Sequence, residues 1–305
     1  MLSRRQIERV VTAALEEDAP WGDLTSEYLI PADAVATADL VAREPGVFSG
    51  GDVFAAAFTI TDPEIAVTLA VRDGAPFARG EVLATVAGPA RGVLTAERIG
   101  LNLVQRMSGI ATLTSRYVAA VAGTHARIAD TRKTTPGLRA LERHAVRSGG
   151  GHNHRFSLSD AVMAKDNHLA VLSAGSDDAG AVTAALRSAL ARLPHTTHVE
   201  VEVDRLDQIE PVLAAGDGAV RIGTIMLDNF SPEQLRAGVA QIAGRATVEA
   251  SGGVSLDTVA EIAATGVDVI SVGALTHSAR ALDLGLDARI EAGFDVTADA
   301  ARIGD

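Results

Sequence analysis

Cysteine is absent from this chain of 305 residues. Disulfide bonds, thiolate metal sites and cysteine nucleophiles are therefore excluded, and a reducing cytoplasm is the compartment that fits. Aromatic residues make up only 3% of the chain against 47% apolar residues, so we expect an aliphatic core and no base-stacking surface. No apolar run reaches the roughly 18 residues that a membrane span needs, and the N-terminus lacks the continuous apolar stretch of a signal peptide.

Lysine is nearly absent too: Lys133 and Lys165 are the only two, and every other basic side chain except histidine is arginine. The formal net charge of −12 argues against nucleic acid and membrane surfaces as partners. Both lysines fall in the segment 130–168, which also contains four of the eight histidines and a run of three glycines. We interpret this segment as an anion-binding centre, with a solvated basic face as the alternative.

The basic residues of this segment clearly outnumber its acidic ones. The basic side chains are Arg132, Lys133, Arg139, Arg143, Arg147, Arg155 and Lys165, and the acidic ones are Asp130, Glu142, Asp160 and Asp166. Lysine offers a compact point charge and arginine a planar fork. The pairing of both types beside glycines is typical of a pocket for a small anionic molecule.

The N-terminal third has the texture of a small α+β domain. Ser3 is a good helix N-cap, and the apolar spacing after it predicts a helix that ends near Asp18. Short β-type runs follow at 35–42, 65–71 and 82–88, separated by Gly-containing turns. We predict an α+β sandwich over 1–108, joined by the C-terminal segment 278–305.

Helical periodicity returns between residues 94 and 122. A break near Ser108-Gly109 predicts two consecutive helices there. Arg98 lies near the start of the first, where an arginine is either solvated or functional.

From residue 126 onward short apolar runs alternate with helical segments. The runs are 126–130, 161–167, 199–204, 223–229, 247–253 and 267–273, and the helices between them are 137–147, 178–193, 205–215, 231–243 and 255–265. Repeated strand–helix units predict parallel strands. Because no Rossmann glycine fingerprint is present, we predict a closed α/β barrel over 109–277 and not an open doubly wound sheet.

Polar or glycine residues end each of these strands. They are Asp130, Lys165, Glu202, Asp228, Ser251 and Gly273, and in α/β barrels that end contains the active site. Glu200 and Glu202 alternate with valines, so strand alternation points both carboxylates to one side, into the barrel if the valines face the helices. Buried there, they need a metal, substrate hydroxyls or a cation such as Lys165 as partner.

These groups suit a phosphorylated sugar and an anionic acceptor. The cationic cluster could bind carboxylates and phosphates. Glu202 and Asp228 could hold Mg²⁺ or sugar hydroxyls, and the strand ends at 251–253 and Gly273 could offer main-chain N–H groups to a phosphate. The irregular spacing of the histidines does not favour a transition-metal site.

Motifs along nearly the whole chain resemble the quinolinate phosphoribosyltransferases, in the expected order. They are GDLTS (22–26), VAREPGVFSGG (41–51), LNLVQRMSGIAT (101–112), DTRKTTPGLRALERHAVRSGGGHNHR (130–155), AKDNH (164–168), VEVEVD (199–204), MLDN (226–229), SGGV (251–254) and VGALTHS (272–278). The segment 130–155 is the most specific of these motifs. The departures are small: Ala164 stands where the family often has a bulkier aliphatic residue, and His152 follows the three glycines.

The resemblance implies a reaction and a site. Quinolinate would take a phosphoribosyl group from phosphoribosyl pyrophosphate with Mg²⁺, lose its 2-carboxylate as CO2, and give nicotinate mononucleotide and pyrophosphate. The implied quinolinate ligands are Arg98, Arg132, His154, Arg155 and Lys165. Lys133 would meet the pyrophosphate, Glu202 and Asp228 the ribose hydroxyls and metal, and Ser251, Gly252, Gly253 and Gly273 the 5′-phosphate. Lys165, Glu202 and Asp228 form the implied catalytic set.

The resemblance also implies a homodimer with shared active sites, or a larger oligomer of such dimers, in which Arg98 serves the partner's site. Three other functions stay open. They are a molybdenum-transport-associated relative, a Schiff-base lyase that uses Lys165, and a transferase for a monocarboxylate such as nicotinate. The doubled cationic set favours a dicarboxylate over the last of these.

Overall fold

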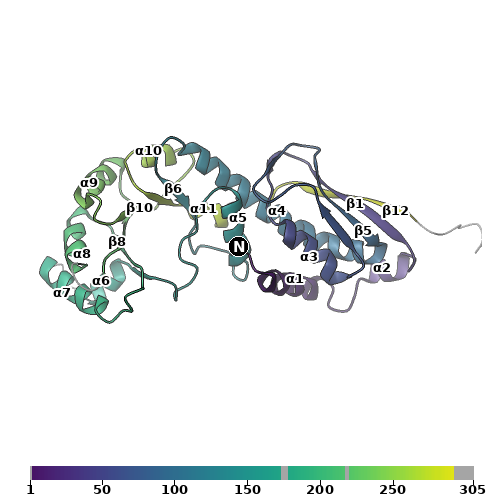
Figure 1. Cartoon of the computed structure of the whole chain (residues 1–305), viewed down its shortest axis with the longest axis horizontal. Helices are drawn as coiled ribbons and strands as arrows, with labels where there is room; N and C mark the ends of the chain where they lie inside the picture. The colour runs from purple at the N-terminus through teal and green to yellow at the C-terminus, as the bar shows by residue number, and fades with distance from the viewer. Residues whose placement is uncertain (1, 173–177, 217–219, 292–305) are drawn as a thin grey trace, which may run out of the picture. The chain divides into compact units, whose positions relative to one another are not determined.

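The computed structural model describes residues 2–172, 178–216 and 220–291, which divide into two compact units (Figure 1). The first unit contains 1–112, 136–149 and 279–305, and the second contains 113–135 and 150–278. These units differ from the predicted boundaries mainly at 136–149, which we placed in the barrel and which packs with the first unit. None of the helices in the described part is long and apolar enough to cross a membrane.

An antiparallel sheet forms the centre of the first unit, with strand order β12-β1-β5-β3. Its strands are β1 (Val35–Ala42), β3 (Ala66–Leu69), β5 (Val82–Pro89) and β12 (Leu284–Glu291), and a small pair is formed by β2 (Gly46–Val47) and β4 (Pro76–Phe77). Alternate residues of β1 are buried, from Ala36 to Ala42, so one face of the sheet packs on the core. The three predicted strands are present, and residues 284–291 of the predicted C-terminal segment pair with β1, whereas 292–305 lie outside the described residues.

Helices α1 (Arg4–Asp18), α2 (Leu24–Leu29) and α3 (Gly51–Thr61) also belong to this unit. Ser3 caps α1 as predicted: its side chain accepts the N–H of Gln6, and the Gln6 side chain accepts the N–H of Ser3. Phe54 and Phe58 of α3 are fully buried, with their ring centroids 4.9 Å apart. We did not predict α2 or α3, because their apolar residues occur in short mixed runs.

The predicted break near Ser108-Gly109 is wrong, because α4 runs from Ala90 to Ala120 without interruption. A Cβ atom at Gly109 would lie only 2.0 Å from the carbonyl oxygen of Arg280. The glycine therefore permits close packing of the returning chain on α4 and does not end the helix. Ser108 is fully buried, and its hydroxyl oxygen accepts the main-chain N–H of Ser49 at 3.1 Å.

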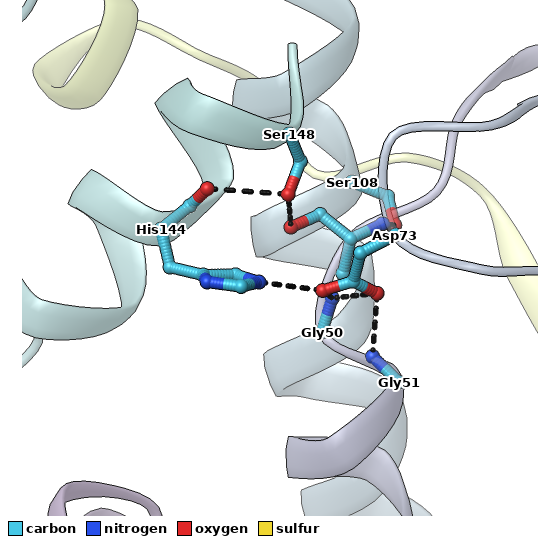
Figure 2. A network of polar contacts seen from close by, with 7 residues as sticks. Gly50, Gly51, Asp73, Ser108, His144 and Ser148 are labelled. Atoms are coloured by element: carbon cyan, nitrogen blue, oxygen red, sulfur yellow. Dashed lines mark hydrogen bonds and ion pairs between the residues drawn. The ribbon is translucent and has the colours of Figure 1, made fainter. Parts of the chain in front are cut away.

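Helix α5 (Arg139–Ser148) is tied to the first unit by the carboxylate of Asp73 (Figure 2). The Nε2 atom of His144 lies 2.5 Å from Asp73 Oδ2. The same carboxylate accepts the main-chain N–H groups of Gly50 and Gly51, each at 3.0 Å. Burial alone raises the pKa of Asp73, but these hydrogen bonds outweigh burial and lower it below its ordinary value.

Two further contacts hold the same helix. Ser49 donates its hydroxyl to Ser148 at 2.9 Å. Arg106 donates to the buried carboxylate of Glu142, with Nη2 and Oε1 2.5 Å apart. Side chains from three places in the sequence thus contact α5, which explains why 136–149 belongs to this unit.

The second unit is built on six parallel strands with the order β6-β11-β10-β9-β8-β7. They are β6 (Arg127–Ala129), β7 (Val162–Ala164), β8 (Val199–Val203), β9 (Thr224–Asp228), β10 (Thr247–Ser251) and β11 (Val269–Ser271). All six fall where the sequence predicted strands. The helices of the unit are α6 (Asp166–Leu172), α7 (Ala179–Leu190), α8 (Ile209–Ala215) with the short η1 (Leu206–Gln208), α9 (Pro232–Ile242), α10 (Val259–Ala263) and α11 (Ala274–His277). Helices α8, α9 and α10 lie outside the strands in Figure 1.

The barrel is open, although we predicted a closed one. Across the described residues β6 and β7 form no ladder with each other. The chain between them first contributes α5 to the first unit and then returns beside β6, where His152 forms an isolated parallel bridge with Ala129. This returning segment lies next to β6, so β7 does not pair with it.

Candidate active site

A cavity of about 530 Å³ lies at the carboxyl ends of the parallel strands. It is lined by Thr131, Arg132, Lys133, His154, Arg155, Met163, Lys165, Glu202, Met226, Asp228, Asn229, Ser251, Gly252, Gly253 and Ser271. The structure thus brings together ten of the twelve predicted site residues, which follow or end different strands. Parallel strands explain this, because their carboxyl ends meet at one edge.

Asp130 fixes the loop that brings two of the basic residues together. Its side chain is fully buried. One carboxylate oxygen accepts the main-chain N–H of His154 at 2.7 Å, and the other accepts the side-chain amide of Asn153 at 2.6 Å. Asp130 therefore binds the segment before Arg155 to the end of β6, next to Arg132.

Arg132 and Arg155 form a pair of cations in this cavity. Burial and the charge of Arg132 lower the pKa of Arg155, and the charge of Glu200 opposes them. The Nε atom of Arg132 is buried and has no hydrogen-bond partner within the described residues. Two like charges and a buried donor without a partner are favourable only if an anion joins them, so this part of the cavity suits a carboxylate.

Lys165 and Glu202 form an ion pair at the ends of β7 and β8. Lys165 Nζ lies 2.5 Å from Glu202 Oε2, and the lysine side chain is 45% exposed while the glutamate is mostly buried. The alternation of β8 places Glu202 inside the barrel, as predicted, and the internal salt bridge considered from the sequence is present. A half-exposed, ion-paired lysine does not have the apolar surroundings that favour a Schiff-base nucleophile.

Glu202 and Asp228 offer oxygen ligands suited to Mg²⁺. Asp228 ends β9, and one of its oxygens accepts the side-chain amide of Asn229 at 2.7 Å. Mg²⁺ prefers oxygen donors and is commonly held by one or two carboxylates together with phosphates and water. These two residues fit that pattern, with the rest of the coordination shell left to a phosphorylated substrate and water.

Glycine is required at the end of β10. Gly252 and Gly253 have φ angles of 91° and 61°, and a Cβ atom on Gly252 would lie 2.1 Å from the Asn229 side-chain oxygen. Asn229 itself has a φ angle of 58°. Two adjacent loops in left-handed conformations can turn main-chain groups toward a ligand. The sequence predicted the glycines, and Asn229 was missed as a cavity residue although it follows Asp228 in the motif MLDN.

Gly273 and Arg98 do not line the cavity. Gly273 lies close to it, because a Cβ atom there would meet Lys133 Cδ at 3.0 Å. The hydroxyl of Thr276 also donates to the main-chain oxygen of Lys133 at 2.7 Å. Arg98 is an exposed residue of α4 within the first unit, so the cavity of the second unit is formed without it.

His154 lies between two buried glutamates inside the barrel. Its Nε2 atom is 3.1 Å from Glu200 Oε2 and 3.5 Å from Glu249 Oε1, and both glutamates are only 4% exposed. Burial lowers the pKa of His154, but the two carboxylates outweigh burial and raise it to about 10. Burial also raises the pKa of Glu200. Glu249 was missed from the sequence, although alternation along β10 places it on the same side as Ser251.

Comparison with known proteins connects this cavity to one family. Residues 23–108 match the quinolinate phosphoribosyl transferase N-terminal domain, and residues 110–287 match the C-terminal domain. A nicotinate-nucleotide pyrophosphorylase [carboxylating] of Mycobacterium leprae is 47% identical over 286 residues, covering 91% of this chain and 95% of the relative. A probable enzyme of the same name from Bacillus subtilis is 38% identical and covers 94% of both chains.

The fold agrees with these relatives. The crystal structure of NadC from Streptococcus pyogenes superimposes with a TM-score of 0.88 at 39% identity, covering 96% of this chain and 99% of that one. The similarity thus extends over both compact units and over every motif that lines the cavity. The chain belongs to the quinolinate phosphoribosyltransferase family.

Proposed function

We propose that this chain transfers a phosphoribosyl group from phosphoribosyl pyrophosphate to quinolinate and releases CO2, giving nicotinate mononucleotide and pyrophosphate for NAD biosynthesis. The similar proteins are named for this activity and align with nearly the whole chain. The single observation that favours it most is the composition of the cavity. Partly buried and exposed cations lie on one side, two carboxylates end neighbouring strands, and glycine loops lie beside them.

The cationic side suits the two carboxylates of quinolinate. Arg132 and Arg155 need an anion between them, and Lys165 supplies a third positive charge at the same cavity. A monocarboxylate would compensate fewer of these charges. The number of positive charges in the cavity therefore favours quinolinate, with two carboxylates, over nicotinate, with one.

The acidic side suits the phosphoribosyl donor. Developing positive charge at C1′ of the ribose would be stabilised by the carboxylates of Glu202 and Asp228. Lys133 is exposed at the cavity and can meet the leaving pyrophosphate, and the loop at Gly252-Gly253 can accept the 5′-phosphate. No protein nucleophile is needed, because positioning the ring nitrogen against C1′ accounts for the reaction.

Mg²⁺ is the cation that we propose for this site. When bound, it would offset the charge of the pyrophosphate group and help it leave. Within the described residues, the three-residue cluster with metal-ligand spacing is His154, Glu200 and Glu249. Glu202 and Asp228 are two ligands only, which agrees with an ion that arrives with its phosphorylated substrate.

We also propose that the active form is a homodimer with shared sites. Arg98 is exposed on α4 and is implied by the family resemblance to contact quinolinate. Trp21, Leu24, Tyr28 and Leu29 are 68–92% exposed around α2; such an apolar patch on a soluble protein commonly marks an interface. The cytoplasmic compartment stays a prediction.

The test is release of ¹⁴CO2 from quinolinate labelled in its 2-carboxylate. We expect release that requires both phosphoribosyl pyrophosphate and Mg²⁺, with one nicotinate mononucleotide formed per CO2. Nicotinate offered in place of quinolinate controls for a monocarboxylate enzyme. Binding of quinolinate without turnover would instead favour the molybdenum-transport-associated alternative, and borohydride trapping of Lys165 would favour the lyase.

A further inference from the structure

His154 has both ring nitrogens occupied by the protein. The main-chain N–H of Arg155 lies 2.8 Å from Nδ1 and donates to it. The Nε2 atom faces the carboxylates of Glu200 and Glu249. The ring thus forms a bridge between two carboxylates inside the barrel and the main chain of a cavity arginine.

The contact at Nδ1 selects one form of the ring. A hydrogen bond from an N–H group requires an unprotonated nitrogen, so Nδ1 is the acceptor and Nε2 bears the proton. The two carboxylates favour a second proton on the ring, because their negative charges raise the pKa of His154. A ring protonated at both nitrogens could not accept from Arg155, so the contact at Nδ1 favours the ring with its single proton on Nε2.

The carboxylates have few other partners. Glu200 Oε1 is buried and forms no hydrogen bond within the described residues. Glu249 Oε1, the atom 3.5 Å from His154 Nε2, is likewise buried without a hydrogen bond, so its contact with His154 is a charge contact only. Two buried carboxylates side by side are costly, and a purely apolar filling would serve stability as well or better. Stability therefore does not explain why the carboxylates of Glu200 and Glu249 both face His154 Nε2, and we look for a functional reason.

We propose that Glu200 and Glu249 are positioning residues for substrate binding: they hold His154 from inside the barrel, and His154 fixes the main chain that presents Arg155 to the substrate carboxylate. This inference rests on the proposed function. In it His154 acts through Arg155 and is not itself a ligand of the substrate.

Two other contacts also fix the position of Arg155. Asp130 already holds the main-chain N–H of His154, and the guanidinium of Arg155 donates to the main-chain oxygen of Ala161 at 2.9 Å. The ring of His154 adds the constraint between these two. Without it the peptide between His154 and Arg155 has a free N–H and can rotate, which would move the guanidinium within the cavity.

The first experiment compares Glu200→Leu with Glu200→Gln in steady-state kinetics. Glutamine keeps an oxygen that can accept from Nε2–H, whereas leucine fills similar space without an acceptor. We expect KM for quinolinate to rise about tenfold in Glu200→Leu and to stay within about threefold in Glu200→Gln, because leucine removes the acceptor of the Nε2–H bond and glutamine keeps one. The KM for phosphoribosyl pyrophosphate should change less than about twofold in either variant, because that part of the cavity is untouched.

Glu142→Gln is the matched control. Glu142 is a buried carboxylate of the first unit that pairs with Arg106, so its loss reports the general effect of removing a buried charge. The proposal is overturned if Glu200→Leu leaves the quinolinate KM unchanged, if Glu200→Gln is as damaged as Glu200→Leu, or if both substrates lose affinity together.

A second measurement reads the ring in the parent protein and does not depend on activity; a variant is needed only to assign the signal. In the parent protein labelled with ¹⁵N-histidine, the His154 ring should show a protonated Nε2 and an unprotonated Nδ1, with the signal assigned by its absence in His154→Gln. A ring protonated at Nδ1 overturns the proposal. If the parent neither binds nor converts quinolinate, the proposed function fails instead, and the ring spectrum still decides how His154 is held.

Discussion

Lys165 is the residue whose chemical type matters most at the cavity. Its ammonium group lies 2.5 Å from Glu202 and remains partly exposed. A planar guanidinium is longer and cannot occupy a point-charge position without displacing its neighbours. We expect Lys165→Arg to lower kcat/KM for quinolinate by at least about tenfold, and Lys165→Ala to cost roughly 2–5 kcal/mol of binding. Steady-state kinetics and calorimetry measure these two effects.

An arginine-to-lysine substitution at an exposed position is the control. Arg192 is exposed, so Arg192→Lys should leave both kinetic constants unchanged. Parent-like activity of Lys165→Arg would show that a positive charge suffices there and that its shape does not matter.

The two strand-end carboxylates should separate donor binding from acceptor binding. Glu202→Gln and Asp228→Asn keep the size of each side chain and remove its charge. Because oxygen anions are the preferred ligands of Mg²⁺, we expect the Mg²⁺-dependent affinity for phosphoribosyl pyrophosphate to fall at least about tenfold. Quinolinate affinity, measured by calorimetry without the donor, should change far less.

An equal loss for both substrates would show that these roles are assigned wrongly. Glu202 is the more demanding case, because its partner is Lys165. Asp228, whose side chain accepts a hydrogen bond only from Asn229 within the described residues, gives the cleaner result.

Sequence patterns predicted on which side of a strand a side chain lies, but not which residues it contacts. Alternation along β8 correctly placed Glu200 and Glu202 inside the barrel, because a strand has a strict period of two. The same rule applied to β10 would have placed Glu249 there too. The approach of both glutamates to His154 was not predictable, since it depends on the loop that returns beside β6 from another part of the chain.

At the scale of elements, local patterns identified all six barrel strands but not the exact path of every helix. Short apolar runs that end in polar residues are specific enough for buried parallel strands. We predicted a helix break at Gly109, but glycine is required there by the close approach of the main chain of Arg280, which is far along the sequence. A glycine that ends a helix and one that permits close packing look the same without that partner.

One of the contacts that hold helix α5 is made by a carboxylate, Asp73, whose charge depends on pH. The pKa of Asp73 is lowered in the folded chain. A lowered carboxyl pKa means that its stabilisation is complete above the unfolded value near about 4 and is lost as the pH falls through the folded value. We expect Asp73→Asn to lower the free energy of unfolding at neutral pH by roughly 1–3 kcal/mol.

The difference in Tm between parent and Asp73→Asn, followed by calorimetry, should therefore shrink as the pH falls from about 6 to about 3. Asp52→Asn, a nearby substitution at an exposed residue of α3, is the control and should show little difference at any pH. A Tm difference that stays constant in acid would mean that the charge of Asp73 is not what holds α5.

At the scale of the whole molecule, the sequence did not predict that one segment of the chain belongs to the other unit. Residues 136–149 lie between two segments of the second unit yet pack with the first. Strand–helix alternation predicted a continuous barrel from 109 to 277, because periodicity describes each element and not the unit against which it packs. The contacts of Asp73, Ser49 and Arg106 with α5 decide the matter, and they are long-range.

Arg98 provides the test of assembly. It is exposed on α4 in the first unit and does not line the cavity. If the active unit is a two-fold dimer with shared sites, each Arg98 serves the partner's cavity, and the same contact occurs twice. Covering an anion site in this way would also exclude water and strengthen its electrostatics. We expect Arg98→Ala and Lys165→Ala each to abolish most activity alone.

Mixing the two inactive variants under exchange conditions should restore activity. In a mixed dimer one site receives the intact Arg98 and the intact Lys165, while the other site lacks both. If exchange is complete at equal amounts, about half of the dimers are mixed and each has one working site of two, so recovery should approach about a quarter of parent activity. Native mass spectrometry of tagged subunits verifies the exchange. Activity that does not return despite verified exchange would mean that Arg98 serves its own chain or has no part in the reaction.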